Sequence, residues 1–98
     1  MDLPTITEHL RAKLVEHGSL NAVLKFDCGM AGVAVIDGRA TPNTVDNTDR
    51  DADCTVALPL ATLAALISGE LEPTTGFMMG KFKVSGDMSV ALKLQRVI

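Results

Sequence analysis

The sequence predicts an α+β fold, in which five strands form one mostly antiparallel sheet that helices cover on one face. Two observations carry this prediction. The apolar residues change their period along the chain, from helical spacing near the N-terminus to strand-like alternation and back to helical spacing. Turn residues, mainly glycines, separate these segments. The expected order is a helix, four strands, two helices of which the second is short, a fifth strand and a closing helix.

The composition fits one small domain over residues 1–98. A chain of 98 residues can bury one modest core, and 47% apolar against 21% charged residues exclude a disordered tail. Aromatic residues make up only 3%, and there are five Met residues. Aliphatic and Met side chains must therefore fill the interior, and flexible Met side chains also tolerate irregular ligands.

The first helix is expected to begin with a capping box. Thr5 takes the N-cap position, and Glu8 stands three residues later, where its side chain can reach back. Ile6, Leu10 and Leu14 then repeat at a spacing of four residues, which predicts one helix face packed on the core.

The strands are predicted from alternation and from turn residues. Residues 20–28 alternate between apolar and polar, residues 33–36 are continuously apolar, and Asp37 and Gly38 form a hairpin turn signal. Residues 41–48 are polar and fit an edge strand. Residues 53–58 alternate again and form the fourth strand.

The second half of the chain returns to helices. Pro59 fits the first turn of a helix, where its missing N–H has no partner in any case. Residues 81–85 alternate as a strand with one buried face, and Gly86 ends it. Asp87 is the expected N-cap of the last helix. On that helix one face carries Met88, Ala91, Leu92 and, as its single polar member, Gln95.

Charge and motifs exclude several classes of function. The net charge is −3, yet residues 73–98 sum to +3. The chain has neither the basic excess nor the aromatic residues that nucleic-acid binding requires, so we expect no nucleic acid partner. The basic segment fits either a solvated face or a transient contact with anionic lipid head groups.

No catalytic or metal-binding motif is present in the sequence. Residues 76–81 are one residue short of a phosphate-binding loop, and Phe82 replaces its Ser or Thr. The alternating acids at 49, 51 and 53 lack the Gly and Glu of a calcium loop. Cys28 and Cys54 have no ligand spacing and are expected to be buried, reduced thiols. We therefore expect no enzyme and no cofactor.

The N-terminus, Met1-Asp2-Leu3-Pro4, lacks the basic residues of a signal peptide, and no apolar run has membrane-spanning length. A cytoplasmic protein is the expectation.

Residues 52–95 resemble the sterol carrier protein-2 family. The resemblance rests on ADCTV at 52–56, LISG at 66–69, EP at 72–73 before GF at 76–77, MGKFKVSGDM at 79–88 and ALKLQ at 91–95. It implies a hydrophobic tunnel between the sheet and its helices, which holds a fatty acid, acyl-CoA, sterol or isoprenoid lipid. It also implies lipid exchange with membranes by loosening of a helix, for which the last helix is the expected element.

The resemblance assigns a set of ligand-binding residues. They are Val35, Cys54 and Val56 as a floor, Leu63 and Ile67 as a cover, and Phe77, Met78, Phe82, Val84, Met88, Ala91, Leu92 and Gln95 as walls. Periodicity alone does not separate such a tunnel from a packed core. If Gln95 is buried, its amide needs a partner such as a lipid head group or water; otherwise it ends a frayed helix.

Three functions are consistent with this sequence. The first is a carrier that binds, transfers or presents lipid. The second is an accessory module that docks an enzyme of lipid metabolism, for example in quinone biosynthesis. The third is a detached relative of domains attached to such enzymes, which needs a catalytic partner.

Overall fold

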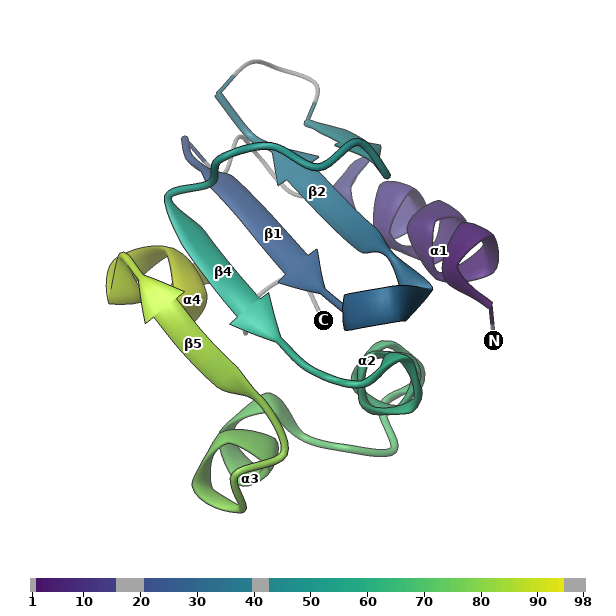
Figure 1. Cartoon of the computed structure of the whole chain (residues 1–98), viewed down its shortest axis with the longest axis vertical. Coiled ribbons are helices and arrows are strands. Elements are labelled where there is room, and N and C mark those ends of the chain that lie inside the picture. The colour runs from purple at the N-terminus through teal and green to yellow at the C-terminus, as the bar shows by residue number, and fades with distance from the viewer. Residues whose placement is uncertain (1, 16–20, 40–42, 95–98) are drawn as a thin grey trace.

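The strands form one mixed sheet in the order β3-β2-β1-β4-β5 (Figure 1). The computed structural model describes residues 2–15, 21–39 and 43–94. The strands are β1 (Val23–Asp27), β2 (Val33–Asp37), β3 (Thr44–Asp46), β4 (Cys54–Ala57) and β5 (Lys83–Gly86). Adjacent strands are antiparallel except β1 and β4, which run parallel. The predicted five-stranded, mostly antiparallel sheet is confirmed.

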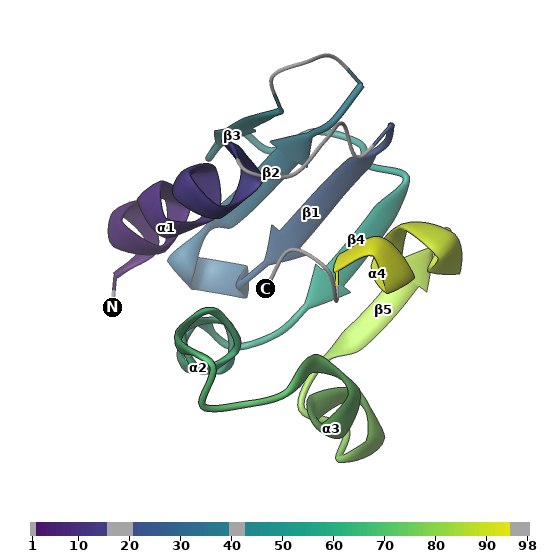
Figure 2. The same cartoon turned by 180° about the vertical axis from the view of Figure 1, so that it is seen from behind.

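The α-helices in the described ranges lie on one face of this sheet. They are α1 (Leu3–Val15), α2 (Leu60–Ser68), α3 (Pro73–Met78) and α4 (Met88–Leu94). Figure 2 shows α1 over the β2–β3 side of the sheet and α4 over β4 and β5. The other two helices lie near the end of the sheet where β4 ends and β5 begins. The predicted cover on one face is confirmed.

The core lies between this face and the helices. Leu24 and Phe26 of β1 point into it and stand opposite Ile36 and Ala34 of β2. Ile6, Leu10 and Leu14 of α1 are no more than 2% exposed, so the predicted stripe packs as expected. Burial of this apolar face is what holds α1 to the sheet.

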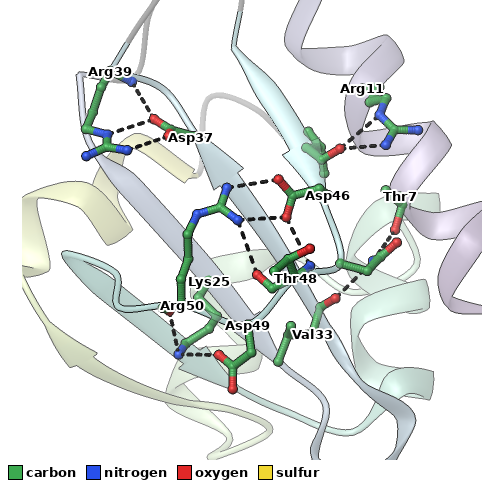
Figure 3. A network of polar contacts seen from close by, with 12 residues as sticks. Thr7, Arg11, Lys25, Val33, Asp37, Arg39, Asp46, Thr48, Asp49 and Arg50 are labelled. Carbon is green, nitrogen blue, oxygen red and sulfur yellow. Dashed lines mark hydrogen bonds and ion pairs between the residues drawn. The ribbon is translucent and has the colours of Figure 1, made fainter.

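The opposite face of the sheet is crossed by the chain between β3 and β4 (Figure 3). Lys25 Nζ donates hydrogen bonds to Asp49 Oδ1 and to the carbonyl oxygen of Arg50, each at 2.9 Å. The Arg50 guanidinium forms two hydrogen bonds with the Asp46 carboxylate, both at 2.9 Å. These contacts hold the crossover against the sheet, and they pair the carboxylates of Asp46 and Asp49 with basic side chains.

Two predicted helix starts are corrected. Helix α1 begins before Thr5, because Asp2 Oδ1 accepts a hydrogen bond from the Thr5 backbone N–H at 2.9 Å and so fills the N-cap role. Glu8 pairs with Arg11 instead of reaching back. Pro59 is the N-cap of α2 rather than a first-turn residue, because its backbone is extended, with ψ at 152°.

The last strand and helix also differ from the prediction. Strand β5 begins two residues later than expected, so Phe82 precedes it. Among the α4 side chains that the structure describes, Val90 is the buried one, at 2% exposed, whereas Met88 and Leu92 are 48% and 62% exposed. Helix α4 is therefore turned so that Met88 and Leu92 of the predicted apolar face lie outside the core, whereas Ala91 packs against it.

Candidate functional site

An apolar pocket of about 120 Å³ lies between α3, the start of β5 and α4. The elements that line it lie at the edge of the sheet formed by β5 (Figure 2). Its lining residues are Pro73, Thr74, Phe77, Phe82, Val84, Met88, Ala91 and Leu92.

The first wall depends on the close approach of α3 to Phe82. Pro73 begins α3, and Gly80, with φ at 71°, turns the chain back after it. The Lys81 backbone N–H then donates to the Gly76 carbonyl oxygen at 2.9 Å, and the Phe77 and Phe82 ring centroids come to 6.0 Å. A Cβ on Gly76 would lie 2.9 Å from the Phe82 ring, so the absence of a side chain lets this ring approach α3 closely.

The second wall depends on the sharp turn between β5 and α4. Gly86 has φ at 94°, and a Cβ there would lie 2.4 Å from the Asp53 carbonyl oxygen. The Asp87 N–H donates to that same oxygen at 2.7 Å. The Asp87 carboxylate accepts hydrogen bonds from the Ser89 hydroxyl at 2.7 Å and backbone N–H at 2.9 Å, and these bonds lower its pKa. The predicted N-cap at Asp87 is confirmed.

The chemistry of the lining is almost entirely apolar. Thr74 contributes the one side-chain hydroxyl among the lining residues, and none of them is ionisable. The half-exposed side chains of Phe77, Met88 and Leu92 bring the pocket to the surface. Such a lining suits a hydrocarbon chain or ring, and offers no nucleophile, acid or base for a reaction.

Six residues of the predicted set meet at this pocket: Phe77, Phe82, Val84, Met88, Ala91 and Leu92. Cys54, Val56, Leu63 and Ile67 lie behind it in the continuous core, where none is more than 4% exposed. Val56 stands directly opposite the lining residue Val84 in the β4–β5 ladder. Burial raises the pKa of the Cys54 thiol, which is consistent with the expected reduced and unreactive cysteine.

Val35 is placed differently from the prediction. It pairs with Lys25 in the sheet register, so it points to the face under the crossover, away from Cys54 and Val56. It is fully buried there, which explains its apolar character. Its assignment to the floor of the pocket is therefore corrected.

Two other predicted residues remain, and the structure places one of them outside the lining. Met78 is 81% exposed and does not border the pocket. Gln95 lies outside the described residues. Sequence reasoning missed the lining residues Pro73 and Thr74. The signal that could have found them is a proline at the start of a short helix next to an apolar segment.

The size of the pocket limits what it holds in this conformation. A dry apolar cavity of roughly 150 Å³ admits benzene, and sites for larger ligands typically span about 300–1,000 Å³. A volume of about 120 Å³ thus accommodates part of an acyl chain. The tunnel implied by the resemblance remains a prediction.

Comparison with known sequences decides the family. The SCP-2 sterol transfer family matches residues 7–98, which is nearly the whole chain. The chain belongs to the SCP-2 sterol transfer family. Membership of this SCP-2 family indicates lipid binding and transfer in general terms.

Curated SCP-2 relatives are much longer than this chain. Sterol carrier protein 2 of Gallus gallus is 45% identical over 51 residues, which are 52% of this chain and 9% of that protein. Hydroxysteroid dehydrogenase-like protein 2 of Xenopus tropicalis is 36% identical over 78 residues, or 80% of this chain and 16% of that protein. The chain therefore spans about a tenth to a sixth of these relatives.

Solved SCP-2 structures share the fold over almost the entire chain. The crystal structure of sterol carrier protein 2 like 2 from Aedes aegypti is 26% identical, with a TM-score of 0.79 over 98% of this chain and 95% of that one. The solution structure of palmitated SCP2L2 from the same organism has a TM-score of 0.79 at 24% identity, over 99% and 94%. A ubiquinone synthesis protein, UbiJ-SCP2, has a TM-score of 0.62 at 22% identity, over 96% and 77%.

None of the helices in the described ranges combines the length and the apolar character that crossing a bilayer requires.

Proposed function

We propose that this SCP-2 domain, residues 1–98, binds a lipid non-enzymatically in the pocket between α3, β5 and α4. The ligand is a fatty acid, acyl-CoA, sterol or isoprenoid lipid, which the domain transfers within the cell or presents to an acceptor. The observation that carries the proposal is the non-ionisable, almost wholly apolar lining of that pocket, in a chain of a sterol transfer family.

Transfer of hydrocarbon out of water supplies the binding energy. Each buried methylene contributes about 0.8 kcal/mol, so a dozen would contribute roughly 10 kcal/mol before ordering and desolvation are subtracted. A chain of that length needs more space than the pocket has now. In this proposal helix α4 supplies it, because its Met88 and Leu92 border the pocket and are partly exposed.

The core residues behind the pocket define the direction in which it would deepen. Val84 and Ala91 are partly buried and pack against the core cluster that contains Cys54 and Val56. Displacement of α4 away from the sheet would expose Cys54 and Val56 to the ligand, with Leu63 and Ile67 further in. In this proposal these four core residues bind the ligand only in the opened state.

The first experiment is native mass spectrometry of the purified protein beside a denatured, solvent-extracted sample. A stoichiometric lipid that is lost on denaturation would support the proposal and identify the class of ligand. A bare mass, together with no binding of fatty acid or sterol on titration, would contradict it.

A filled-pocket variant tests the location of the site. In Ala91→Phe the new ring occupies the pocket, so a fluorescent fatty acid should bind at least about tenfold more weakly, since roughly two methylenes or more are excluded. The matched control is Ala12→Phe, which places the same ring on the exposed side of α1. Equal affinities in the two variants would place the ligand elsewhere. Circular dichroism checks that both variants are folded.

The second candidate is an accessory module that docks an enzyme of lipid metabolism. It is favoured by the relatives in which the matching region is only 9% to 16% of a longer protein. In that case the surface around the pocket meets a protein partner, and the chain lacks lipid or holds it only for stability. A bare native mass and unaltered stability with added fatty acid would favour this candidate.

A further inference from the structure

The lining of the apolar pocket contains one polar side chain, that of Thr74. It lies in the first turn of α3, directly after Pro73, and is exposed. The other side chains of the lining offer only carbon and sulfur atoms to a ligand. The Thr74 hydroxyl makes no hydrogen bond to another residue in the described ranges, and a hydroxyl can both donate and accept. This group is therefore free to bond a polar atom of a bound lipid.

The neighbouring hydroxyl groups are placed differently from that of Thr74. Thr75 belongs to the same turn of α3 and is also exposed, but it does not line the pocket. Ser89 of α4 donates its hydroxyl to the carboxylate of the residue that caps its own helix, at 2.7 Å. Ser85 of β5 follows the lining residue Val84, so strand alternation turns it to the opposite face of the sheet. Thr74 is thus the hydroxyl that the fold presents to a ligand at this site.

Among the described residues, no basic side chain lies in the lining to pair with a charged head group. Lys83 precedes Val84 in β5 and points to the opposite face of the sheet by the same alternation. Lys93 of α4 lies close enough to Asp87 to help lower the pKa of that carboxyl. Lys81 is exposed outside the lining. A carboxylate drawn into the pocket would therefore be unpaired, which costs much more than moving an uncharged oxygen out of water.

From this arrangement we infer that Thr74 determines which polar end of a lipid the pocket accepts, through a hydrogen bond from its hydroxyl to an uncharged oxygen. The ligand class is a lipid alcohol, whose hydroxyl meets Thr74 while its hydrocarbon fills the apolar part of the pocket. A sterol and an isoprenoid alcohol share this chemistry. The carboxylate of a fatty acid instead stays in water outside the lining. This inference rests on the proposed function, for which it names the ligand class and a specificity-determining residue.

The test compares decanol with decanoate at neutral pH, because the two share one hydrocarbon chain and differ in the polar end. Each displaces a fluorescent fatty acid from delipidated protein, after the affinity of that probe has been measured for each variant. Thr74→Val removes the hydroxyl and keeps the shape of the side chain. It should weaken decanol binding about fivefold, the worth of one net hydrogen bond, and change decanoate binding less than about twofold.

Two further variants separate the hydroxyl from its surroundings. Thr75→Val makes the same change one residue along α3, outside the lining, and should leave both affinities unaltered. Thr74→Ser keeps the hydroxyl and should bind decanol within about twofold of the unchanged protein, a rescue that a purely structural role of Thr74 would not give. Circular dichroism checks that all the variants are folded.

Farnesol and cholesterol distinguish the two sources of a lipid hydroxyl. An affinity that falls about fivefold in Thr74→Val, for either compound, identifies an isoprenoid or a sterol as the lipid whose hydroxyl reaches Thr74. A loss for neither compound contradicts the assignment to a lipid alcohol. The inference is also overturned if Thr74→Val binds decanol as the unchanged protein does, or if decanoate binding falls as much as decanol binding. An equal loss in Thr75→Val would overturn it as well.

The same titrations separate this inference from the proposed function. If the unchanged protein binds the fluorescent fatty acid and Thr74→Val shows no selective loss for the alcohol, the inference fails and the proposed function stands. If the unchanged protein binds neither the fatty acid nor any of the alcohols, the proposed function itself fails and the inference fails with it.

Discussion

At the scale of single residues, two glycines determine the walls of the pocket. Gly76 lets the Phe82 ring approach the backbone of α3, and Gly86 lets β5 turn into α4 against the Asp53 carbonyl oxygen. The obstacle at Gly76 is a side chain that can shift, whereas the obstacle at Gly86 is backbone. Gly86 is therefore the position at which a side chain should be least tolerated.

Gly86→Ala tests this point against Gly80→Ala. Both residues have positive φ, 94° and 71°, but a Cβ on Gly80 would meet nothing within 4 Å. Gly80→Ala should reduce the free energy of unfolding by roughly 1–2 kcal/mol, the usual difference for a left-handed residue. Gly86→Ala should lose at least about 1 kcal/mol more, because a carbonyl oxygen must move as well. Urea unfolding measures both, and equal losses would contradict the backbone contact.

At the scale of elements, the crossover between β3 and β4 depends on ion pairs on the open face of the sheet. Hydrogen bonds from Arg50 lower the pKa of Asp46, and those from Arg39 lower the pKa of Asp37 to about 2 (Figure 3). Both carboxylates therefore hold their protons more weakly in the folded chain than in the unfolded chain. The stability they contribute is complete above about pH 4 and is lost as the pH falls toward 2.

The resulting prediction concerns acid sensitivity. Stability should fall between about pH 4 and pH 2, and the double variant Arg39→Gln, Arg50→Gln should show a smaller fall over that range. Each pair is partly exposed, so solvent screening should keep its contribution to stability small. Urea midpoints at several pH values provide the measurement. A fall of the same size in the double variant would assign the acid sensitivity to other groups.

At the scale of the whole molecule, core and pocket residues should respond differently to truncation. A domain of this size is stabilised by only about 5–15 kcal/mol. Leu63 is fully buried in the core, whereas Leu92 is 62% exposed and borders the pocket. The same Leu→Ala change at the two positions therefore separates a structural role from a role in ligand binding.

Leu63→Ala should reduce the free energy of unfolding by about 2–5 kcal/mol, because it leaves a cavity in the core. Leu92→Ala should reduce it by less than about 1 kcal/mol but weaken fatty acid binding about fivefold, since apolar contact with the ligand is lost. Urea unfolding and a fluorescent fatty acid titration give the two readouts. A large loss of stability in Leu92→Ala would show that this side chain belongs to the core.

The sequence by itself determined the order of the elements, the five strands and most of the buried face of each one. These features follow from local period and turn chemistry, as the stripe of Ile6, Leu10 and Leu14 and the N-cap at Asp87 illustrate. The family resemblance added six residues that the fold brings to one pocket.

Only the tertiary structure decided which apolar residues face that pocket. Val35 and Cys54 are both buried in strands, yet sheet register sends them to opposite faces, and Val35 lies on the face that carries the Lys25–Asp49 and Arg50–Asp46 ion pairs. In α4, packing turned Val90 to the core and left Met88 and Leu92 at the pocket mouth. The period of the apolar residues determines which residues share one face of a helix or strand. Contacts between segments distant in the chain determine whether that face packs on the core, the pocket or the crossover.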